Sequence, residues 1–357
     1  MRKILKSLAI LLAAAIAVVG GYLAYVCIDY HRLPDMIDDA NAGDDLLPEP
    51  GGATPLDIIT WNLGFGAYSA DFSFFMDGGR ESRAYSKEAV WENIGHSLDL
   101  LEAEDPDFML LQEIDTCATR SHSIDEAALI LERFDRQAFF AQNYDSPYLF
   151  YPVFKPHGAA KSGILTLSDY GITRRERHSL PVESGFMKFL DLDRCYSKCY
   201  IEIEGGDRQL ILYNLHLSAY TSDGTIATEQ LKLLCADMLE EYEKGNYVIA
   251  GGDFNKDLPG NSEEIFGVPG DAFTWAQPLD AGIIPEGLAL VDSLDPENPV
   301  PSCRNTDIPY TPGKSFVLTV DGFIVSDNVS VVDCHVIDEG FACSDHNPVK
   351  LRFTLNP

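Results

Sequence analysis

The sequence is poor in positive charge. Its 357 residues include 26 Lys and Arg against 56 Asp and Glu, which gives a formal net charge of -30 at pH 7. This balance excludes a protein that coats nucleic acid through a basic surface. No repeat at a fixed period is visible, and the composition fits neither collagen, nor a coiled coil, nor a compact disulfide scaffold. With 46% hydrophobic and 11% aromatic residues, the chain is an acidic globular protein.

Cysteine is also scarce. The chain has 8 cysteines, and those beyond residue 30 are odd in number, which is compatible with disulfides but requires none. Cys195 and Cys199 are spaced like a pair of metal ligands, but no second pair has matching spacing. We therefore expect these two to be buried free thiols and leave disulfide pairing open.

One long apolar run stands apart from the rest of the chain. Leu8 to Ile28 contains no charged side chain, and as a helix it would extend about 30 Å, the thickness of a bilayer's hydrocarbon core. A cleaved signal peptide usually has a shorter apolar region that ends in a small-residue cleavage site. The sequence predicts an uncleaved membrane anchor over residues 1–29, with cleaved secretion as the alternative. Val26 before Cys27 does not favour lipidation of that cysteine.

Charges around this run predict its orientation. Arg2, Lys3 and Lys6 precede the run and Asp29 follows it, so the N-terminus is expected in the cytoplasm and the remainder outside. Residues 30–357 carry 23 cations and 55 anions, a formal charge of -32. An anionic membrane surface would repel this part.

The exported part divides into a spacer and a folded domain. Residues 30–55 include the acidic, turn-rich sequence LPDMIDDANAGDDLLPEPGGATP, which predicts a solvated linker. Residues 56–357 are expected to form one α/β domain. Apolar runs predict strands at Leu56 to Trp61, Phe108 to Leu111, Gly163 to Leu167, Cys199 to Ile203, Leu210 to Leu217, Tyr247 to Ala250, Phe316 to Val325, Val329 to Val336 and Val349 to Phe353. Helical spacing predicts helices at Lys87 to Ala103, Ile124 to Phe134 and Thr225 to Tyr242.

Polar side chains recur at the ends of these apolar strands, inside one of them and just before the last. Such groups are expensive to desolvate unless they are paired or bound to a cation, so their recurrence needs a physical reason. They are Asn62 in LDIITWN, Gln112 and Glu113 in FMLLQE, His216 in LILYNLH, Asp253 and Asn255 in YVIAGGDFN, Asp321 in TVDGF, and Asp345 and His346 in SDHNP.

Each of these motifs also has a structural explanation. Asn62 before Gly64 suits a turn, Glu113 a solvated strand exit, and Asp253 a cap within a tight turn. His216 suits a hydrogen-bonded core histidine, and the SDH sequence suits an Asx turn. Singly, none of them decides for function.

Together and in order, WN, QE, NxHL, GGDFN, VDGFIVSDN and SDHNPV resemble the endonuclease/exonuclease/phosphatase superfamily. The resemblance extends from Leu56 to about Phe353. Members include deoxyribonuclease-I-like nucleases, abasic-site endonucleases, inositol polyphosphate 5-phosphatases, deadenylases and neutral sphingomyelinases, which share metal-assisted phosphoester hydrolysis. The resemblance implies a four-layer αββα sandwich with the active site at one edge.

The resemblance also implies a metal site. Glu113 matches the superfamily's metal-binding glutamate, Asn62 the asparagine beside it, and Asp345 a second carboxylate that binds or orients the metal. Oxygen ligands of this kind suit Mg²⁺ or Mn²⁺. A cation there would offset the charge that builds up on the phosphoryl group in the transition state.

The remaining matches are catalytic. Asp253 and Asn255 match the pair that orients or deprotonates the attacking water, and Asp253 is the leading candidate for the general base. Asp321 and His346 match a carboxylate–imidazole dyad in which His346 acts as a base or as a phosphate clamp. His216 matches the histidine that contacts the phosphate or assists the leaving group, and which abasic-site endonucleases lack.

Some features depart from the pattern or add to it. Residue 214 is Asn where related motifs have Thr before His, and Gly322 stands where many members have Tyr. Arg304 and Lys161 could be rim cations for phosphate, but surface ion pairs explain them equally.

The substrate is the least determined property. The only dense basic run is TRRER at 173–177, and a formal charge of -32 argues against non-specific duplex binding. The aromatic segments 72–76 and 144–152 suit a core, or contacts to a zwitterionic lipid headgroup. We therefore expect a small or lipid phosphoester, with a surface nuclease and a non-catalytic phosphate-binding module as alternatives. No protein partner is inferred.

Overall fold

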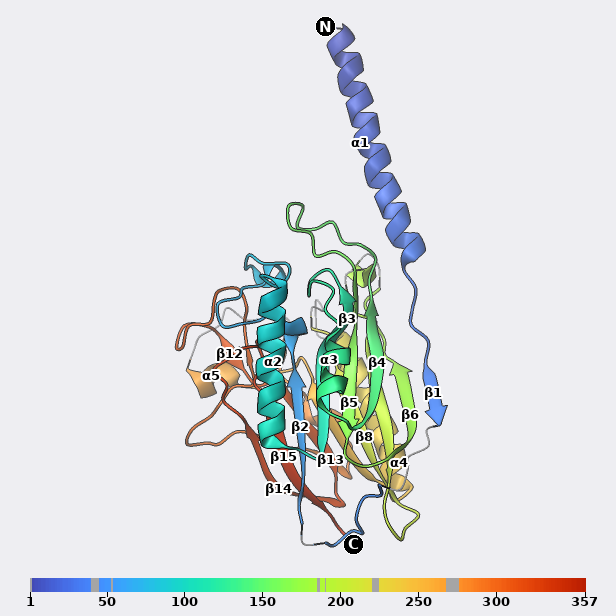
Figure 1. Ribbon diagram of the computed structural model, residues 1–357, viewed down its shortest axis with the longest axis vertical. Helices are drawn as coiled ribbons and strands as arrows, with labels where there is room; N and C mark the ends of the chain where they lie inside the picture. The colour runs from blue at the N-terminus through green and yellow to red at the C-terminus, as the bar shows by residue number, and fades with distance from the viewer. Residues whose placement is uncertain are drawn as a thin grey trace.

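Two large β-sheets pack face to face, and helices cover their outer faces (Figure 1). The computed structural model describes residues 2–39, 45–52, 54–184, 187–189, 191–219, 225–267 and 276–357. Within these residues the domain has four layers, helix, sheet, sheet and helix. The predicted αββα sandwich is confirmed, with an apolar helix before it.

The first sheet has six strands in the order β14-β15-β2-β3-β5-β4. Only β2 and β3 are parallel, so their carboxyl ends meet at one edge. The strands are β2 (Leu56–Asn62), β3 (Phe108–Ala118), β4 (Gln137–Asp145), β5 (Ala160–Ser168), β14 (Val329–Val336) and β15 (Val349–Leu355).

The second sheet has seven strands in the order β1-β6-β7-β8-β9-β13-β10. Here β8 and β9 are the parallel pair. The strands are β1 (Met36–Asp39), β6 (Ile172–Ser179), β7 (Cys195–Glu202), β8 (Gln209–His216), β9 (Tyr247–Asp253), β10 (Leu288–Leu290) and β13 (Asp321–Ser326), and a separate two-stranded sheet joins β11 (Cys303–Arg304) to β12 (Val317–Leu318).

Five α-helices and four short 3₁₀ helices complete the described chain. Ser86 caps the start of α2 through its side chain, and Asp125 does the same for α3. The α-helices are α1 (Arg2–Asp29), α2 (Lys87–Glu104), α3 (Glu126–Arg133), α4 (Thr225–Glu243) and α5 (Ser262–Phe266), and the 3₁₀ helices are Gly64–Gly66, Phe75–Asp77, Met187–Phe189 and Ala281–Ile283.

Strand periodicity separates the core into layers. Ile58 points between the two sheets, whereas the next residue, Ile59, packs beneath α2 and α3. Successive side chains on a strand face opposite sides, so a strand covered on both faces is apolar throughout. On the second sheet, Ile211 and Val248 pack beneath α4 in the same way.

The predicted segments correspond to strands and helices, but the structure has further elements. The run Phe316 to Val325 divides into β12 and β13, and the strands β4, β6, β10 and β11 and the helix α5 lie outside the predicted segments. Part of the expected spacer joins the domain, since β1 pairs with β6 and Leu47 is buried. All eight cysteines are free thiols, and Cys195 and Cys199 are buried as expected.

Helix α1 is long and apolar enough to cross a membrane, a test that signal sequences pass as well. It projects from one end of the domain (Figure 1), and only Val26 of the helix is buried. At its carboxyl end, Tyr22 and Tyr25 form hydrogen bonds with the backbone of residues 148 and 150.

Candidate active site

The predicted site residues meet where the parallel strands of both sheets end. On β8 and β9, His216 lies directly beside Asp253, and on the antiparallel neighbour β13, Asp321 lies on the other side of Asp253. In the facing sheet, Asn62 is the last residue of β2 and lies beside Gln112. Strand register therefore gathers side chains that are up to 259 positions apart in the chain.

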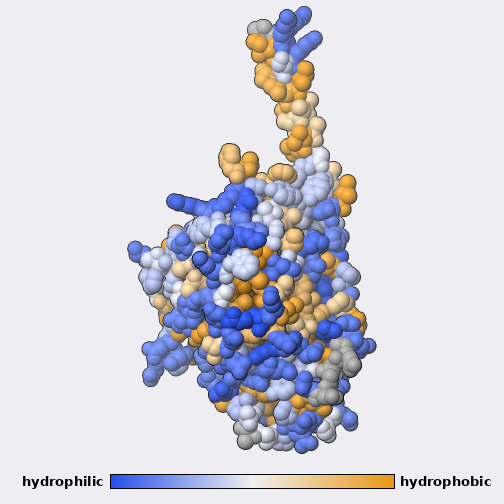
Figure 2. All heavy atoms as spheres, in the orientation of Figure 1, coloured by the Kyte–Doolittle hydropathy of each residue, from blue (hydrophilic) through white to orange (hydrophobic). Residues whose placement is uncertain are grey.

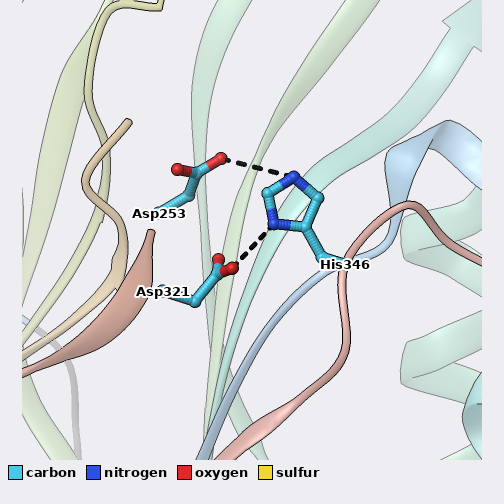
Figure 3. Close-up of side chains that lie close together, drawn as sticks. All are labelled: Asp253, Asp321 and His346. Carbon is cyan, nitrogen blue, oxygen red and sulfur yellow. Dashed lines mark hydrogen bonds and ion pairs between the residues drawn. The ribbon is translucent and has the colours of Figure 1, made fainter. Parts of the chain in front are cut away.

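Asp321 and His346 form a buried dyad (Figure 3). Oδ2 of Asp321 lies 2.7 Å from Nδ1 of His346 and also accepts a 2.8 Å hydrogen bond from the hydroxyl of Ser302. Although burial by itself lowers the pKa of His346, the charges of Asp321 and Asp253 and the nearby Cys303 thiol raise it well above its usual value. The imidazole is held as a cation whose second nitrogen, Nε2, points toward Asp253.

Asp253 is the centre of the site. Its Oδ2 accepts a 3.1 Å hydrogen bond from Nδ2 of Asn62 and lies 3.8 Å from Nε2 of His346 and 3.5 Å from Nε2 of His216. Its Oδ1 accepts a hydrogen bond of 2.8 Å from the backbone N–H of Asn255. Burial raises the pKa of Asp253 to about 7, even though His346 acts in the opposite direction.

Glu113 lies inside a strand, which corrects the expected position at a strand end. The strand β3 continues to Ala118, and its pairing with β5 is interrupted by an irregularity between Leu111 and Ile114. Glu113 has a φ of 56°, a left-handed conformation that is uncommon for a residue other than glycine. The bulge turns its half-buried side chain into the cleft, where Oε1 lies 3.5 Å from Nδ2 of Asn62.

Asp345 lies near Glu113 and beside the turn after β2. Burial raises the pKa of Asp345 to about 6, against the effects of His346 and Arg304. The turn needs glycine at position 64, which has a φ of 54°. A Cβ there would lie 3.1 Å from Oδ1 of Asp345 and only 2.6 Å from the ring of Tyr68.

His216 is held neutral. Burial lowers the pKa of His216 well below its usual value, and the charges of Arg194 and His346 act in the same direction. Among the described residues, its buried Nδ1 has no hydrogen-bond partner. A neutral imidazole next to a carboxylate can donate or accept one hydrogen bond without adding charge to the site.

These side chains line one cleft with a cavity volume of about 120 Å³. All eight predicted residues come together, because Asp321 lies directly behind His346 and the other seven are in the wall: Asn62, Glu113, His216, Asp253, Asn255, Asp345 and His346. The wall also contains three arginines, Arg120, Arg194 and Arg304, and His157.

The sequence analysis missed Arg120 and Arg194. Arg120 is buried, pairs with Asp115 at 2.8 Å and lies 4.0 Å over the ring of Phe65. Arg194 is also buried and donates a 3.4 Å hydrogen bond to the backbone oxygen of His216. Neither belongs to a recognisable motif. Arg120 lies in the connection from β3 to α3 and Arg194 directly before β7, and only the fold brings them to the cleft.

The structure distinguishes the two additional candidates for a phosphate-binding cation, Arg304 and Lys161. Arg304 is 1% exposed and donates to the backbone oxygens of Ser69 and Phe72, so the surface ion-pair explanation is wrong for it. Lys161 is the opposite case, a largely exposed side chain whose Nζ lies 3.2 Å from Oδ2 of Asp145.

The basic run at 173–177 forms most of β6 rather than a free patch. Arg174 pairs with Glu176 and Arg175 with Asp38, while Arg177 is buried against the backbone of Leu33 and Pro34. The arginines of this run therefore interact within the domain.

Gln112 and Asn214 have a structural role. Nε2 of Gln112 donates a 2.8 Å hydrogen bond to Oδ1 of Asn214, and Nδ2 of Asn214 donates to the backbone oxygens of Leu111 and Leu165. These bonds tie the two sheets together beneath the cleft, which gives a physical reason for Asn at position 214.

Two groups of ligand atoms could hold a cation. Asp253, Asp321 and His346 offer atoms that lie within 4.8 Å of one another. In that group, however, Asp321 and His346 already satisfy each other through a 2.7 Å bond. Glu113 and Asp345 fit a hard cation better, because both supply carboxylate oxygens. Burial raises the pKa of Asp345, and the nearby cations His346 and Arg304 do not fully offset that effect.

Comparisons with known proteins support the fold. The chain is similar to an endonuclease/exonuclease/phosphatase structure from Beutenbergia cavernae DSM 12333, with 19% identity, a TM-score of 0.56, and coverage of 85% of this chain and 72% of that one. It is also similar to ANGEL2, a 2',3'-cyclic phosphatase, in complex with adenosine-2',3'-vanadate, with 15% identity, a TM-score of 0.56, and coverage of 92% and 100%.

The human Nocturnin catalytic domain with bound sulfate is a third similar structure, with 18% identity, a TM-score of 0.53, and coverage of 90% and 97%. No protein-family model and no curated protein matches the chain. At these identities the likeness shows a shared fold, and at that level the resemblance to the endonuclease/exonuclease/phosphatase superfamily is confirmed.

Proposed function

We propose that this protein is a divalent-metal-dependent phosphoesterase that hydrolyses a small or lipid phosphoester by attack of water. One observation carries the proposal: buried Asp253 lies between Asn62 and the Asp321–His346 dyad, in a cleft that also holds Glu113 and Asp345. Burying so many ionisable groups is costly unless a ligand compensates them. A phosphate and a divalent cation together would do so.

Glu113 and Asp345 would hold the metal, Mg²⁺ or Mn²⁺. When bound, the metal would polarise the phosphoryl group and offset the negative charge of the transition state. Oδ1 of Asn62 accepts a 3.0 Å hydrogen bond from the N–H of Gly64, while its Nδ2 faces Asp253 and Glu113. We therefore assign Asn62 chiefly to positioning Asp253 rather than to direct ligation.

Asp253 would accept the proton of the attacking water. A general base works best with a pKa near the working pH, and burial raises the pKa of Asp253 to about 7. Hydrogen bonds from Asn62 and from the N–H of Asn255 fix both carboxylate oxygens. Asn255 holds this position with a φ of 48°, a conformation that asparagine tolerates better than most residues.

His346 would act as a phosphate clamp. Asp321 fixes Nδ1, and Nε2, which lies 3.6 Å from Sγ of Cys303 and 3.8 Å from Oδ2 of Asp253, would donate its proton to a phosphoryl oxygen. His216 stays neutral and would contribute a hydrogen bond to the phosphate or the leaving group. Arg194 and Arg120 also line the cleft, where Arg194 lies 3.5 Å from Asp191 and Arg120 2.8 Å from Asp115.

The small cleft supports a small phosphoester over a duplex. Its volume is about 120 Å³, and the basic run in β6 is paired within the domain. A nuclease remains the alternative, since one structure of this fold binds adenosine-2',3'-vanadate. We further propose that α1 is an uncleaved anchor that places the domain outside the cytoplasm, as the charges around it predict.

The test uses the full chain in detergent micelles with bis-p-nitrophenyl phosphate, sphingomyelin and plasmid DNA, each with Mg²⁺ or with chelator. We expect hydrolysis of the small ester that chelation abolishes and that Glu113→Gln reduces at least about 100-fold. The control is Glu297→Gln, an exposed glutamate that should leave the rate unchanged.

The other outcomes separate the alternatives. Cleavage of plasmid alone would favour the nuclease. Hydrolysis that survives chelation would contradict the metal assignment, and a folded protein that hydrolyses nothing would favour a binding module.

Metal binding can be measured without turnover. A metal at 100 times its dissociation constant stabilises the folded state by about 2.7 kcal/mol. Saturating Mg²⁺ or Mn²⁺ should therefore raise the thermal unfolding midpoint of the wild type but not that of Glu113→Gln. An equal rise in both proteins would place the metal elsewhere.

A further inference from the structure

The connection between β4 and β5 contains an exposed apolar loop, residues 147–156, with no charged side chain before Lys155. Phe154 is fully exposed, and Val153 and Phe150 are 75% and 58% exposed. Large apolar side chains clustered on a surface at this exposure indicate contact with something other than water.

This loop lies against the carboxyl end of α1. The hydroxyl of Tyr22 donates to the backbone oxygen of Tyr148 at 3.1 Å, and the hydroxyl of Tyr25 accepts from the N–H of Tyr148 at 3.0 Å. The rings of Tyr22 and Phe150 also meet edge to face, with centroids 5.3 Å apart. Figure 1 shows the loop, in green, beside the helix, and Figure 2 shows hydrophobic atoms exposed at that end of the domain.

The position of this contact along α1 indicates which part of a bilayer would surround the loop. Tyr22 lies six residues before Ile28, the last residue of the uncharged run, which corresponds to about 9 Å along the helix axis. Interfacial segments bury their apolar side chains about 5–10 Å into the boundary between headgroups and acyl chains. Tyrosines are also enriched at that boundary. If α1 spans a bilayer, the loop reaches the interface.

The loop also leads to the cleft. The ring of Tyr151 packs on Phe75 with centroids 5.6 Å apart, and Phe75 packs on Phe74, which lines the cleft. His157, which comes directly after the loop, lines the cleft as well, and its backbone N–H donates a 3.0 Å hydrogen bond to the backbone oxygen of Tyr151. The loop and the wall of the cleft therefore form one continuous structure.

We propose that the 147–156 loop inserts Phe150, Val153 and Phe154 into the interface of a zwitterionic bilayer beside α1, and that the phosphoester of a lipid headgroup is the substrate. This inference rests on the proposed phosphoesterase activity and on α1 as an anchor. A zwitterionic surface is specified because the exported part carries a formal charge of -32, which an anionic surface would repel.

Insertion is tested with the full chain in phosphatidylcholine vesicles, where Phe154→Trp places a fluorophore on the loop. Brominated acyl chains should quench this tryptophan and its emission should shift to the blue, after subtraction of the wild-type signal. The matched control is Val332→Trp, at an exposed valine on β14, at the far end of the domain from α1 (Figure 1), where no quenching is expected. Absence of quenching at position 154 would overturn the proposal, whatever the enzyme activity.

The substrate is tested by replacing Phe150, Val153 and Phe154 together with serine. We expect about a tenfold loss in cleavage of sphingomyelin or phosphatidylcholine in vesicles, with unchanged hydrolysis of bis-p-nitrophenyl phosphate. The control replaces three exposed apolar residues elsewhere with serine, Leu131, Leu233 and Val332, and should alter neither rate.

The outcomes separate the two proposals. Equal loss on both substrates would make the loop merely structural and overturn the inference. A wild type that cleaves the soluble ester but no vesicle lipid would overturn the lipid substrate and leave the phosphoesterase intact. A wild type that cleaves neither would remove the proposed function, while the quenching result would still decide whether the loop enters the membrane.

Discussion

Two of the buried clusters of charged side chains in the described part of the domain are organised in opposite ways. One joins β7 to α4 through Lys198, Asp237 and Glu241, and the other is the cleft around Asp253 and Asp345. Burial desolvates the carboxylates in both, so burial alone does not distinguish them. They differ in whether the protein itself supplies the compensating partners.

In the β7–α4 cluster, the protein itself supplies the partners of the buried carboxylates. Nζ of Lys198 lies 2.8 Å from Asp237 and 2.8 Å from Glu241, and Tyr196 donates to Asp237 at 2.7 Å. Asn246 donates a further hydrogen bond of 2.8 Å to Glu241. With these partners the pKa of Glu241 is low, although burial acts in the opposite direction.

In the cleft, by contrast, the protein does not fully compensate the buried carboxylates. The carboxyl groups of Asp253 and Asp345 have raised pKa values because the neighbouring cations do not offset the cost of burial. Asp321 has a buried oxygen, Oδ1, without a hydrogen-bond partner among the described residues. A buried ionic cluster that is satisfied holds the fold together, whereas one with raised carboxyl pKa values in an open cleft indicates a ligand that supplies the missing charge.

The largest expected effect comes from Asp253→Asn. The amide cannot accept the proton from water, so kcat on bis-p-nitrophenyl phosphate should fall roughly 10³- to 10⁴-fold. The thermal midpoint without metal should stay the same or rise, because a buried carboxylate is replaced by a neutral group. Asp237→Asn is the control from the other cluster and should do the reverse, lowering the midpoint and sparing kcat. A large loss of stability in Asp253→Asn would place this residue with the structural cluster.

The next largest effect concerns Lys198→Met. Removing the lysine leaves Glu241 buried beside Asp237 without its principal cation, which should cost about 3–5 kcal/mol of unfolding free energy. Denaturant unfolding measures this loss, and kcat per folded molecule should not change. The triple variant Lys198→Met, Asp237→Leu, Glu241→Leu should recover much of the stability, since hydrophobic replacement of a whole buried ionic group is often neutral. A fall in kcat would connect this cluster to the cleft.

The apolar strands were predictable because a strand covered on both faces is hydrophobic throughout. The strand β4 (QAFFAQNYD) was missed because polar residues interrupt it, and β6 (ITRRERHS) because its arginines suggested a surface patch. The pairing that uses those arginines comes partly from β1 and partly from ion pairs within the sheet, and neither is visible in the local sequence.

The eight candidate site residues were found because their motifs keep a fixed order, which the resemblance to a family makes recognisable. Their geometry was not predictable. The bulge that places Glu113 in the cleft depends on the register between β3 and β5, and Arg194, the residue before β7, reaches His216 because β7 pairs with β8. Both depend on contacts between segments far apart in the chain, which local pattern cannot specify.

The smallest predicted effect is the pH dependence of the β7–α4 cluster. Burial alone would raise the pKa of Glu241, but hydrogen bonds from Lys198, Lys244 and Asn246 lower it to about 2. In the unfolded chain a glutamate has a pKa of about 4.3. Since the folded state favours the ionised form, Glu241 stabilises the fold fully above about pH 4.3, and this contribution is lost as pH falls through about 2.

Urea unfolding of the wild type and Glu241→Gln in detergent micelles between pH 6 and pH 2 measures this dependence. The difference in unfolding free energy between the two proteins should be constant near pH 6 and shrink toward pH 2. Glu243→Gln, at an exposed position on the same helix, should show little difference at any pH. If the difference between the wild type and Glu241→Gln stayed constant down to pH 2, the ionised carboxylate of Glu241 would not owe its stabilising effect to Lys198. The β7–α4 cluster would then not be a charge-compensated cluster, and its contrast with the cleft would be wrong.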